Sequence, residues 1–157
     1  MRHPCRKNGG FTLLEMMVVV VVVGILTTLA VDTLKGVSLR QQKSAAAQEI
    51  QALLNQARSM ARSTAVPATV TLTQVATVPG GTVVAAIGAP VNWSRTLNLG
   101  PGSDYKSVGL VGVPQGPFTF SPRGTVTPNG FTMNVQDPTG QKVVVAVGLV
   151  GDITITQ

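Results

Sequence analysis

Cysteine and histidine are almost absent from this chain of 157 residues, which contains one of each, Cys5 and His3. The chain therefore cannot form an internal disulfide bond. After residue 5 it lacks the most common metal ligand and the most common general base. No serine beyond that point has a histidine partner, which excludes a Ser–His catalytic site. The acidic residues are scattered along the sequence, so we predict no catalytic residue, no metal site and no cofactor, and we do not expect an enzyme.

Charged residues are also scarce, at 11 % of the sequence, whereas hydrophobic residues reach 44 %. Much of this excess lies in residues 11–31, an apolar run of 21 residues with six consecutive valines at 18–23. A helix of this length is about 31 Å long, close to the thickness of a bilayer core. No proline interrupts residues 11–65, so nothing forces a kink. We predict one helix over residues 11–64, with residues 11–31 spanning a membrane.

A single carboxylate, Glu15, lies inside this apolar run, and the basic residues Arg2, Arg6 and Lys7 precede it. An ionised group in hydrocarbon is costly, so it must find a partner or take up a proton. The basic residues predict a cytoplasmic N-terminus and a following domain on the outer face of the membrane. The formal net charge is +6 for the whole chain and +3 without residues 1–10, so the high pI partly reflects this first segment.

Residues 10–15 read Gly-Phe-Thr-Leu-Leu-Glu directly after the basic segment. This pattern resembles the class III signal of type IV prepilins and type II secretion pseudopilins. The resemblance implies that residues 1–10 are a leader peptide. A prepilin peptidase then cuts between Gly10 and Phe11 and N-methylates Phe11. It also implies that the Glu15 carboxylate meets the N-terminal amine of a neighbouring subunit and sets the register between subunits in a filament.

Two simpler interpretations of the N-terminus remain. The first is an ordinary secretory signal peptide, cleaved at about residues 28–30; the charge of Glu15 argues against it, because such apolar regions are normally uncharged. The second is a plain membrane anchor in which Glu15 has no role.

Residues 32–64 continue the helix in amphipathic form, and we expect its apolar stripe to pack against a sheet. A surface helix of an independent domain would show the same stripe. The stripe consists of Ala46, Ile50, Leu53, Leu54, Ala57 and Ala61. From residue 65 to residue 157, glycine, proline, valine and threonine dominate, and short apolar runs alternate with turn signals. We therefore predict an α+β fold, in which a long N-terminal helix packs on an antiparallel β-sheet domain.

The predicted strands cover residues 69–78, 82–87, 93–99, 108–113, 118–120, 131–136, 142–148 and 152–156. In this region the sequence FTFSPRG at residues 118–124, the Gly-Phe at 130–131 and the Asp-Pro-Thr-Gly turn at 137–140 resemble the GspH/FimT type of minor pseudopilin or minor pilin. The resemblance implies a pilin-like subunit that initiates or caps a type IV pilus or a type II secretion pseudopilus. Its partners would be prepilin peptidase, other pilins or pseudopilins and the bacterial inner membrane.

A DNA-binding minor pilin of a natural-transformation pilus is the alternative function. Arg58 and Arg62, four residues apart on the predicted helix, are the candidate DNA contacts, although a solvated helix flank explains them as well. Some FimT-type proteins bind DNA through an arginine-containing motif after the last glycine. Here Asp152 follows Gly151, and an aspartate repels phosphate, so nucleic acid is not the favoured partner. A membrane-anchored periplasmic domain without a filament role is the third interpretation.

Overall fold

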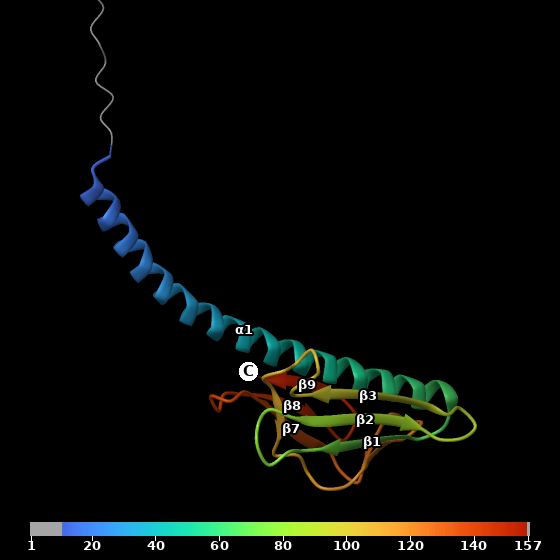
Figure 1. Cartoon of the computed structure of the whole chain (residues 1–157). Helices are drawn as coiled ribbons and strands as arrows, with labels where there is room; N and C mark the ends of the chain where they lie inside the picture. Colours follow the sequence, from blue (N-terminus) through green and yellow to red (C-terminus); the bar gives the residue numbers. More distant parts are fainter. Residues whose placement is uncertain (1–10, 157) are drawn as a thin grey trace, which may run out of the picture. The chain divides into compact units, whose positions relative to one another are not determined.

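The computed structural model describes residues 11–156, except for the side chains of residues 29–35. The chain divides into two compact units, Met1–Val37 and Ser38–Gln157, and one helix, α1 (Leu13–Thr64), has residues in both. Figure 1 shows these elements and labels α1, β1, β2, β3, β7, β8 and β9. The predicted leader, residues 1–10, lies outside the described residues. The side chains of residues 29–31, at the end of the predicted membrane span, lie outside them too.

In the first unit, α1 begins directly after Thr12. The Thr12 hydroxyl accepts a hydrogen bond of 3.2 Å from the backbone N–H of Glu15 and so caps the helix. All the side chains of residues 11–28 are exposed. Within the described residues, no helix combines the length and the apolar character needed to cross a membrane.

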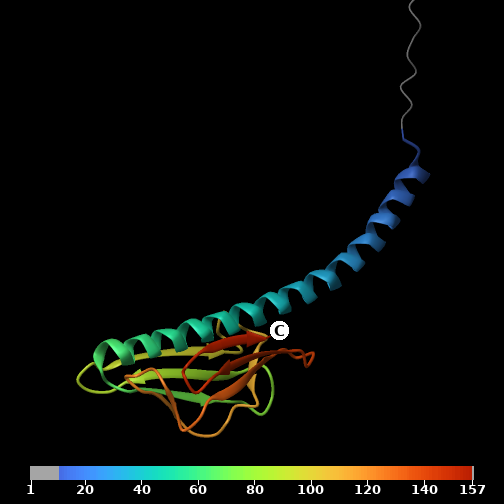
Figure 2. The ribbon, with the colours of Figure 1, turned by 180° about the vertical axis from the view of Figure 1, so that it is seen from behind.

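In the second unit, α1 buries one face against the β-strands. The predicted stripe is confirmed, because each of its six residues is at most 2 % exposed, and Ala47 is buried beside them. Residues on the opposite side of the helix are exposed: Gln48, Asn55, Ser59 and Arg62. Figures 1 and 2 both show this part of α1 running alongside the strands. The helix therefore belongs to the core of the domain and is not an added surface element.

The end of α1 follows from its last residues. The hydroxyls of Ser63 and Thr64 donate to the carbonyl of Met60, at 3.2 and 2.7 Å. Ala65 then adopts a positive φ of 57°, and Pro67 cannot continue a helix. The predicted helix end at residues 63–64 is confirmed.

Within residues 11–156, nine strands form two antiparallel sheets. The five-stranded sheet has the order β3-β2-β1-β5-β6, and the four-stranded sheet has the order β4-β7-β8-β9. The strands of the first sheet are β1 (Ala68–Thr73), β2 (Gly81–Ile87), β3 (Trp93–Leu99), β5 (Phe118–Phe120) and β6 (Val126–Thr127). Those of the second are β4 (Gly109–Val111), β7 (Phe131–Gln136), β8 (Lys142–Val147) and β9 (Ile153–Thr156). Buried and partly exposed residues alternate along β2, β7 and β8, so each sheet presents one face to a common core.

Backbone contacts join the two sheets at two places. Gly80 forms a parallel bridge with Gly109, and the backbone N–H of Val126 donates to the carbonyl of Leu149 at 3.0 Å. At the first join the chains approach so closely that a Cβ on Gly109 would lie 3.0 Å from the backbone N and O of Gly80. A side chain on Gly109 would require the two backbones to move apart by a few tenths of an ångström, so glycine suits this close approach.

Most predicted strands agree with the structure, and those at 93–99 and 131–136 have the predicted bounds. The strand predicted at residues 108–113 is shorter, at Gly109–Val111, and two further differences have a clear physical reason. The first strand ends at Thr73 and not at residue 78, because Gln74 leaves the sheet and its side-chain oxygen accepts a hydrogen bond from the backbone N–H of Val113. The two-residue strand β6 was not predicted, since it is too short to show any alternation.

Candidate functional site

The N-terminal end of the described chain carries the predicted processing site. Phe11 is 79 % exposed and precedes the helix, and the neighbouring Gly10 lies outside the described residues. Cleavage between Gly10 and Phe11 and N-methylation of Phe11 therefore stay predictions.

Glu15 occupies the third position of α1, one turn from the capping Thr12. A threonine cap followed three residues later by glutamate is the pattern of a capping box, and a negative charge in the first turn is favourable near the positive end of the helix dipole. We did not predict this local role from the sequence, although Thr12 and Glu15 show the pattern. Glu15 is exposed, so its carboxylate is also accessible to a second chain. A role of Glu15 in subunit register stays a prediction.

The helix around Glu15 presents apolar side chains in every direction. The large hydrophobic residues between 11 and 26 are all exposed: Phe11, Leu13, Leu14, Met16, Met17, the valines at 18–23, Ile25 and Leu26. A continuous apolar surface of this kind marks an interaction with a protein or a membrane. It is therefore the strongest candidate for a functional surface in the first unit.

In the second unit, a buried ion pair fastens the β7–β8 turn to α1. Lys43 and Asp137 are only 4 % and 2 % exposed, and the Lys43 ammonium lies 2.8 Å from Asp137 Oδ2 and donates to Gln141 Oε1 at 3.1 Å. Asp137 Oδ1 accepts three further hydrogen bonds, from the backbone N–H and hydroxyl of Thr139 and from the backbone N–H of Gln141. The predicted turn at residues 137–140 is confirmed, whereas no local sequence pattern indicates its link to Lys43.

The pKa of Asp137 reflects two opposed causes. Burial raises the pKa, but the hydrogen bonds from Lys43, Thr139 and the Gln141 backbone, together with the Lys43 charge, lower it by more. The pKa of Asp137 therefore lies below its ordinary value, and the carboxylate is ionised at neutral pH. The pair is thus a fixed electrostatic link between helix and sheet.

A second polar cluster lies on the other flank of the helix. The hydroxyl of Tyr105 donates to Glu49 Oε2, and Glu49 also faces Arg95, whose guanidinium lies 3.7 Å from Glu49 Oε1 and donates to Gln56 Oε1 at 3.0 Å. Residues 102–105 and strand β3 are joined to α1 in this way. Arg95 thus contacts Glu49 and Gln56 of the helix. Trp93, two residues earlier, is partly buried and packs against the core.

The cluster predicts an unusual titration of Tyr105. Burial, the hydrogen bond to Glu49 and the charges of Glu49 and Asp104 raise the pKa of Tyr105 to about 12. The folded state then holds the proton more tightly than the unfolded state, so this group's contribution to stability is present below about pH 10 and is lost as the pH rises toward 12. Because the chain has one tyrosine, tyrosinate absorbance reports this group alone. We expect the absorbance of Tyr105 to titrate with a midpoint near pH 12 in the folded protein and near pH 10 in urea. Glu49→Gln should lower the midpoint of the folded protein. A midpoint at pH 10 in the folded protein would contradict the contact between Tyr105 and Glu49.

Arg58 and Arg62 lie close to two glycines of the C-terminal region. Arg58 Nη2 donates to the carbonyl of Val150 at 2.5 Å, and within the described chain its Nε is buried without a hydrogen-bond partner. A Cβ on Gly151 would lie 2.8 Å from Arg58 Nε, and one on Gly124 would collide with the guanidinium of Arg62. Arg58 is therefore not the solvated helix flank that the sequence allowed, whereas Arg62 is exposed. Their role as DNA contacts stays a prediction.

The residues that the structure describes do not bring together three or more of His, Cys, Asp and Glu in a group that could hold a metal ion. The contacts of Glu49, Asp137 and Tyr105 instead connect the helix to loops and strands. These groups therefore serve packing within the domain.

Comparison with families of known proteins gives two matches. Residues 5–31 match the prokaryotic N-terminal methylation motif, and residues 46–151 match the type II transport protein GspH. No curated protein matches the sequence.

Two solved structures of the type IV minor pilin FimU from Pseudomonas aeruginosa strain PAO1 are similar to this chain. The first is 20 % identical and has a TM-score of 0.54, over 75 % of this chain and 90 % of the FimU chain. The second, from another crystal form, is 20 % identical and has a TM-score of 0.51, over 73 % and 92 % of the two chains. At this identity the likeness shows the fold alone. It confirms the predicted α+β architecture, in which a long helix packs on antiparallel sheets.

Proposed function

The chain belongs to the family of type II transport protein GspH, and from this premise we propose that it initiates or caps a thin filament, a type II secretion pseudopilus or a type IV pilus. The family is one of minor pilins and pseudopilins, which are structural subunits. We propose no enzymatic activity for the chain. Its function is to assemble with other pilins or pseudopilins.

The observation that carries this proposal is the uncovered apolar helix of residues 11–28, with Glu15 in its first turn. A water-soluble domain buries such a surface, whereas a filament subunit keeps it for the helices of its neighbours. The match of residues 5–31 to the methylation motif supports the same interpretation. In this proposal, prepilin peptidase cuts after Gly10 and methylates Phe11, and the new amine meets Glu15 of the adjacent subunit.

Before assembly, we propose, residues 11–31 hold the protein in the bacterial inner membrane by a single pass, with a cytoplasmic N-terminus. Residues 32–64 then form the helical part of the periplasmic domain and residues 65–157 its β-rich part. The basic leader of residues 1–10 supports this orientation. The DNA-receptor alternative is less well supported, because Arg58 already binds the carbonyl of Val150.

Mass spectrometry of the N-terminus, on protein isolated from its native host, tests the proposal. We expect a chain that begins at Phe11 and carries one added methyl group, recovered together with other pilins in sheared or detergent-extracted filaments. An N-terminus near residue 31 would indicate an ordinary signal peptide. An uncut chain would indicate a plain membrane anchor. Either result would overturn the filament function.

A further inference from the structure

The turn between β8 and β9 presents two apolar side chains where turns ordinarily carry polar ones. Residues 148–151 read Gly-Leu-Val-Gly, and the backbone N–H of Gly151 donates to the carbonyl of Gly148 at 2.9 Å. Turns of this size favour glycine, proline, asparagine, aspartate and serine. Leu149 and Val150 are instead 59 % and 66 % exposed, and they are the exposed large hydrophobic residues among the described residues of the second unit. The turn itself does not require these two residues, so their exposure points to a contact.

Neighbouring elements hold the backbone of this turn in place. The carbonyl of Leu149 accepts a hydrogen bond of 3.0 Å from the backbone of β6, and the carbonyl of Val150 accepts one from Arg58. Gly151 approaches the carbonyl of Gly124 so closely that a Cβ would collide with it. The turn is thus bound to the domain through its backbone, whereas its two apolar side chains stay uncovered. A contact surface that is already ordered loses little entropy when it binds.

Arginines surround the two apolar side chains. The guanidinium of Arg62 packs against Gly124 in the β5–β6 turn, and Arg123 precedes that glycine. Both arginines are exposed, and Arg58 lies beside them. Asp152 is the acidic residue at this end, and its carboxylate folds back against the β8–β9 turn. Three positive charges and one negative charge therefore lie at this end of the domain. The tip surface, as we call it, consists of Leu149, Val150, Arg62 and Arg123.

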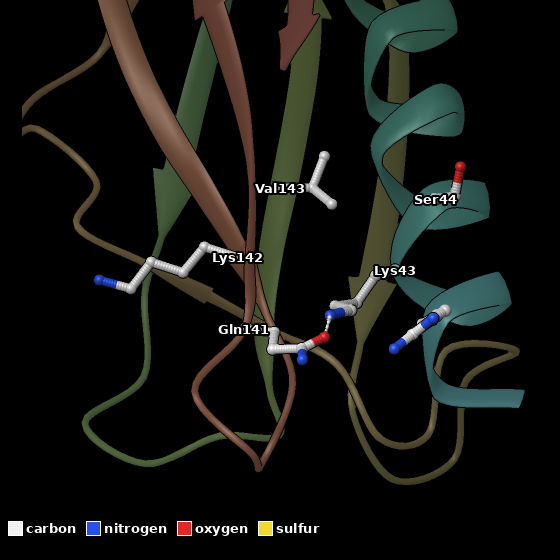
Figure 3. Close-up of a pocket in the computed structure, with 6 residues that line it drawn as sticks. Lys43, Ser44, Gln141, Lys142 and Val143 are labelled. Carbon is white, nitrogen blue, oxygen red and sulfur yellow. Dashed lines mark hydrogen bonds between the residues drawn. The ribbon is translucent and has the colours of Figure 1, made fainter. Parts of the chain in front are cut away.

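The cations near the β7–β8 turn are arranged differently. Figure 3 shows Lys43 directed toward Gln141, whereas Lys142 points away from both. Asp137 neutralises Lys43. These cations do not surround exposed apolar side chains, so they offer a matched comparison for the tip surface.

An exposed apolar pair with a basic rim is complementary to a protein surface of the opposite character. Arginine is enriched in protein interfaces, and aliphatic side chains contribute binding energy when an apolar recess removes them from water. We propose that the tip surface binds a neighbouring pilin or pseudopilin. Leu149 and Val150 enter an apolar recess of that subunit, and the two arginines pair with carboxylates at its rim. Nucleic acid is less complementary, because it leaves the apolar pair uncovered and Asp152 repels its phosphates.

Photo-crosslinking in filaments from the native host tests the proposal. A benzophenone amino acid replaces Val150 or, as a control, the exposed Thr71 of β1, and irradiated filaments are digested for mass spectrometry. We expect residue 150 to join a pilin or pseudopilin at a peptide that contains both apolar and acidic residues. Residue 71 should not join this peptide. The absence of a protein adduct, or an adduct to nucleic acid, lipid or a peptide without carboxylates, overturns the proposal.

Two double variants separate the apolar contact from the charges. Leu149→Ser/Val150→Ser should reduce incorporation into filaments on the order of tenfold or more, because the burial of two aliphatic side chains is lost. Arg62→Gln/Arg123→Gln should reduce it roughly threefold to tenfold, as expected for two ion pairs at the rim of an interface.

A third double variant, Arg40→Gln/Lys142→Gln, removes the same charge from exposed residues near the β7–β8 turn and should incorporate normally. An equal loss in both charge variants would indicate a general effect of charge and overturn the assignment of the arginines. Normal incorporation of the serine variant would overturn the tip surface. Circular dichroism of each variant verifies that the fold is intact.

The identity of the partner rests on the proposed filament function, and the two can fail separately. A chain with a methylated Phe11 that enters filaments in spite of Leu149→Ser/Val150→Ser keeps the filament function and loses only the tip surface. An uncut chain outside the filament fraction overturns the filament function and, with it, the partner proposed for the tip surface.

Discussion

Asp137→Ala is expected to destabilise the domain by about 3–5 kcal/mol, the usual cost of leaving one member of a buried ion pair alone. The substitution leaves the Lys43 ammonium at 4 % exposure with Gln141 as a neutral partner. It also removes the acceptor of three hydrogen bonds that shape the β7–β8 turn. Urea unfolding of the full chain in neutral detergent measures the effect, with fluorescence of the single tryptophan, Trp93, as the probe.

Two control variants separate the ion pair from a general effect of lost charge. Asp104→Ala removes an exposed carboxylate and should change stability by no more than about 0.5 kcal/mol. Lys43→Met/Asp137→Leu removes both charges and should be close to neutral, because an apolar pair of similar volume needs no desolvation of charge. Equal stability of Asp137→Ala and Asp104→Ala would show that the pair does not hold the turn to the helix.

The pH dependence follows from the lowered pKa of Asp137. The folded state binds this proton more weakly than the unfolded state, whose pKa is about 3.9. The stabilising contribution is therefore complete well above pH 4 and is lost as the pH falls through the lower folded-state value. Asp137→Asn should make the stability of the protein less sensitive to pH in this acidic range.

Glu15→Ala is expected to reduce incorporation into filaments on the order of a hundredfold, if the carboxylate pairs with the amine of Phe11 in a neighbouring subunit. Loss of one partner of a desolvated ion pair typically costs about 3–5 kcal/mol, which gives at least this factor. The measurement compares the amount of protein in the filament fraction with the amount in the membrane fraction. Membrane insertion should survive, because the substitution makes the segment more apolar.

The capping role of Glu15 requires its own controls. Glu15→Gln keeps a side chain that suits the third position of a capped helix but removes the charge, whereas Thr12→Ala removes the cap and keeps the charge. We expect Glu15→Gln to assemble as poorly as Glu15→Ala. Thr12→Ala should cost the helix only about 1 kcal/mol. If Thr12→Ala assembled poorly and Glu15→Gln assembled normally, Glu15 would act in helix capping and not in subunit register.

Helices and strands whose apolar residues recur at a regular spacing were predictable from the sequence. The helical stripe around Ile50 and Leu54 and the alternation in residues 131–136 each require one burial pattern, and the structure has it. The turn at residues 137–140 was predictable from its proline and glycine. In each case the information is local, because a few neighbouring residues determine both the backbone and the buried face.

Contacts between distant residues could not be predicted in this way. Lys43 and Gln141 are 98 positions apart, and Arg58 and Val150 are 92 positions apart. A lysine on an amphipathic helix ordinarily extends into solvent, and only the approach of the β7–β8 turn explains why Lys43 is buried. The glycines at 124 and 151 gave a partial signal, since each leaves room for an arginine from the helix. Which arginine lies beside which glycine, however, depends on how the helix packs on the sheets.

Three side chains of α1 in the second unit bind the same sheet at intervals of about two helical turns. Lys43 binds the β7–β8 turn, Gln51 donates to the carbonyl of Ile153 at 2.9 Å, and Arg58 donates to the carbonyl of Val150. The attachment thus extends over about 22 Å of helix. A force applied along the helix axis loads these three contacts in shear. They therefore bear the force at the same time and do not break one after another. Tension that enters through the helix is shared along the β-domain before any single contact breaks.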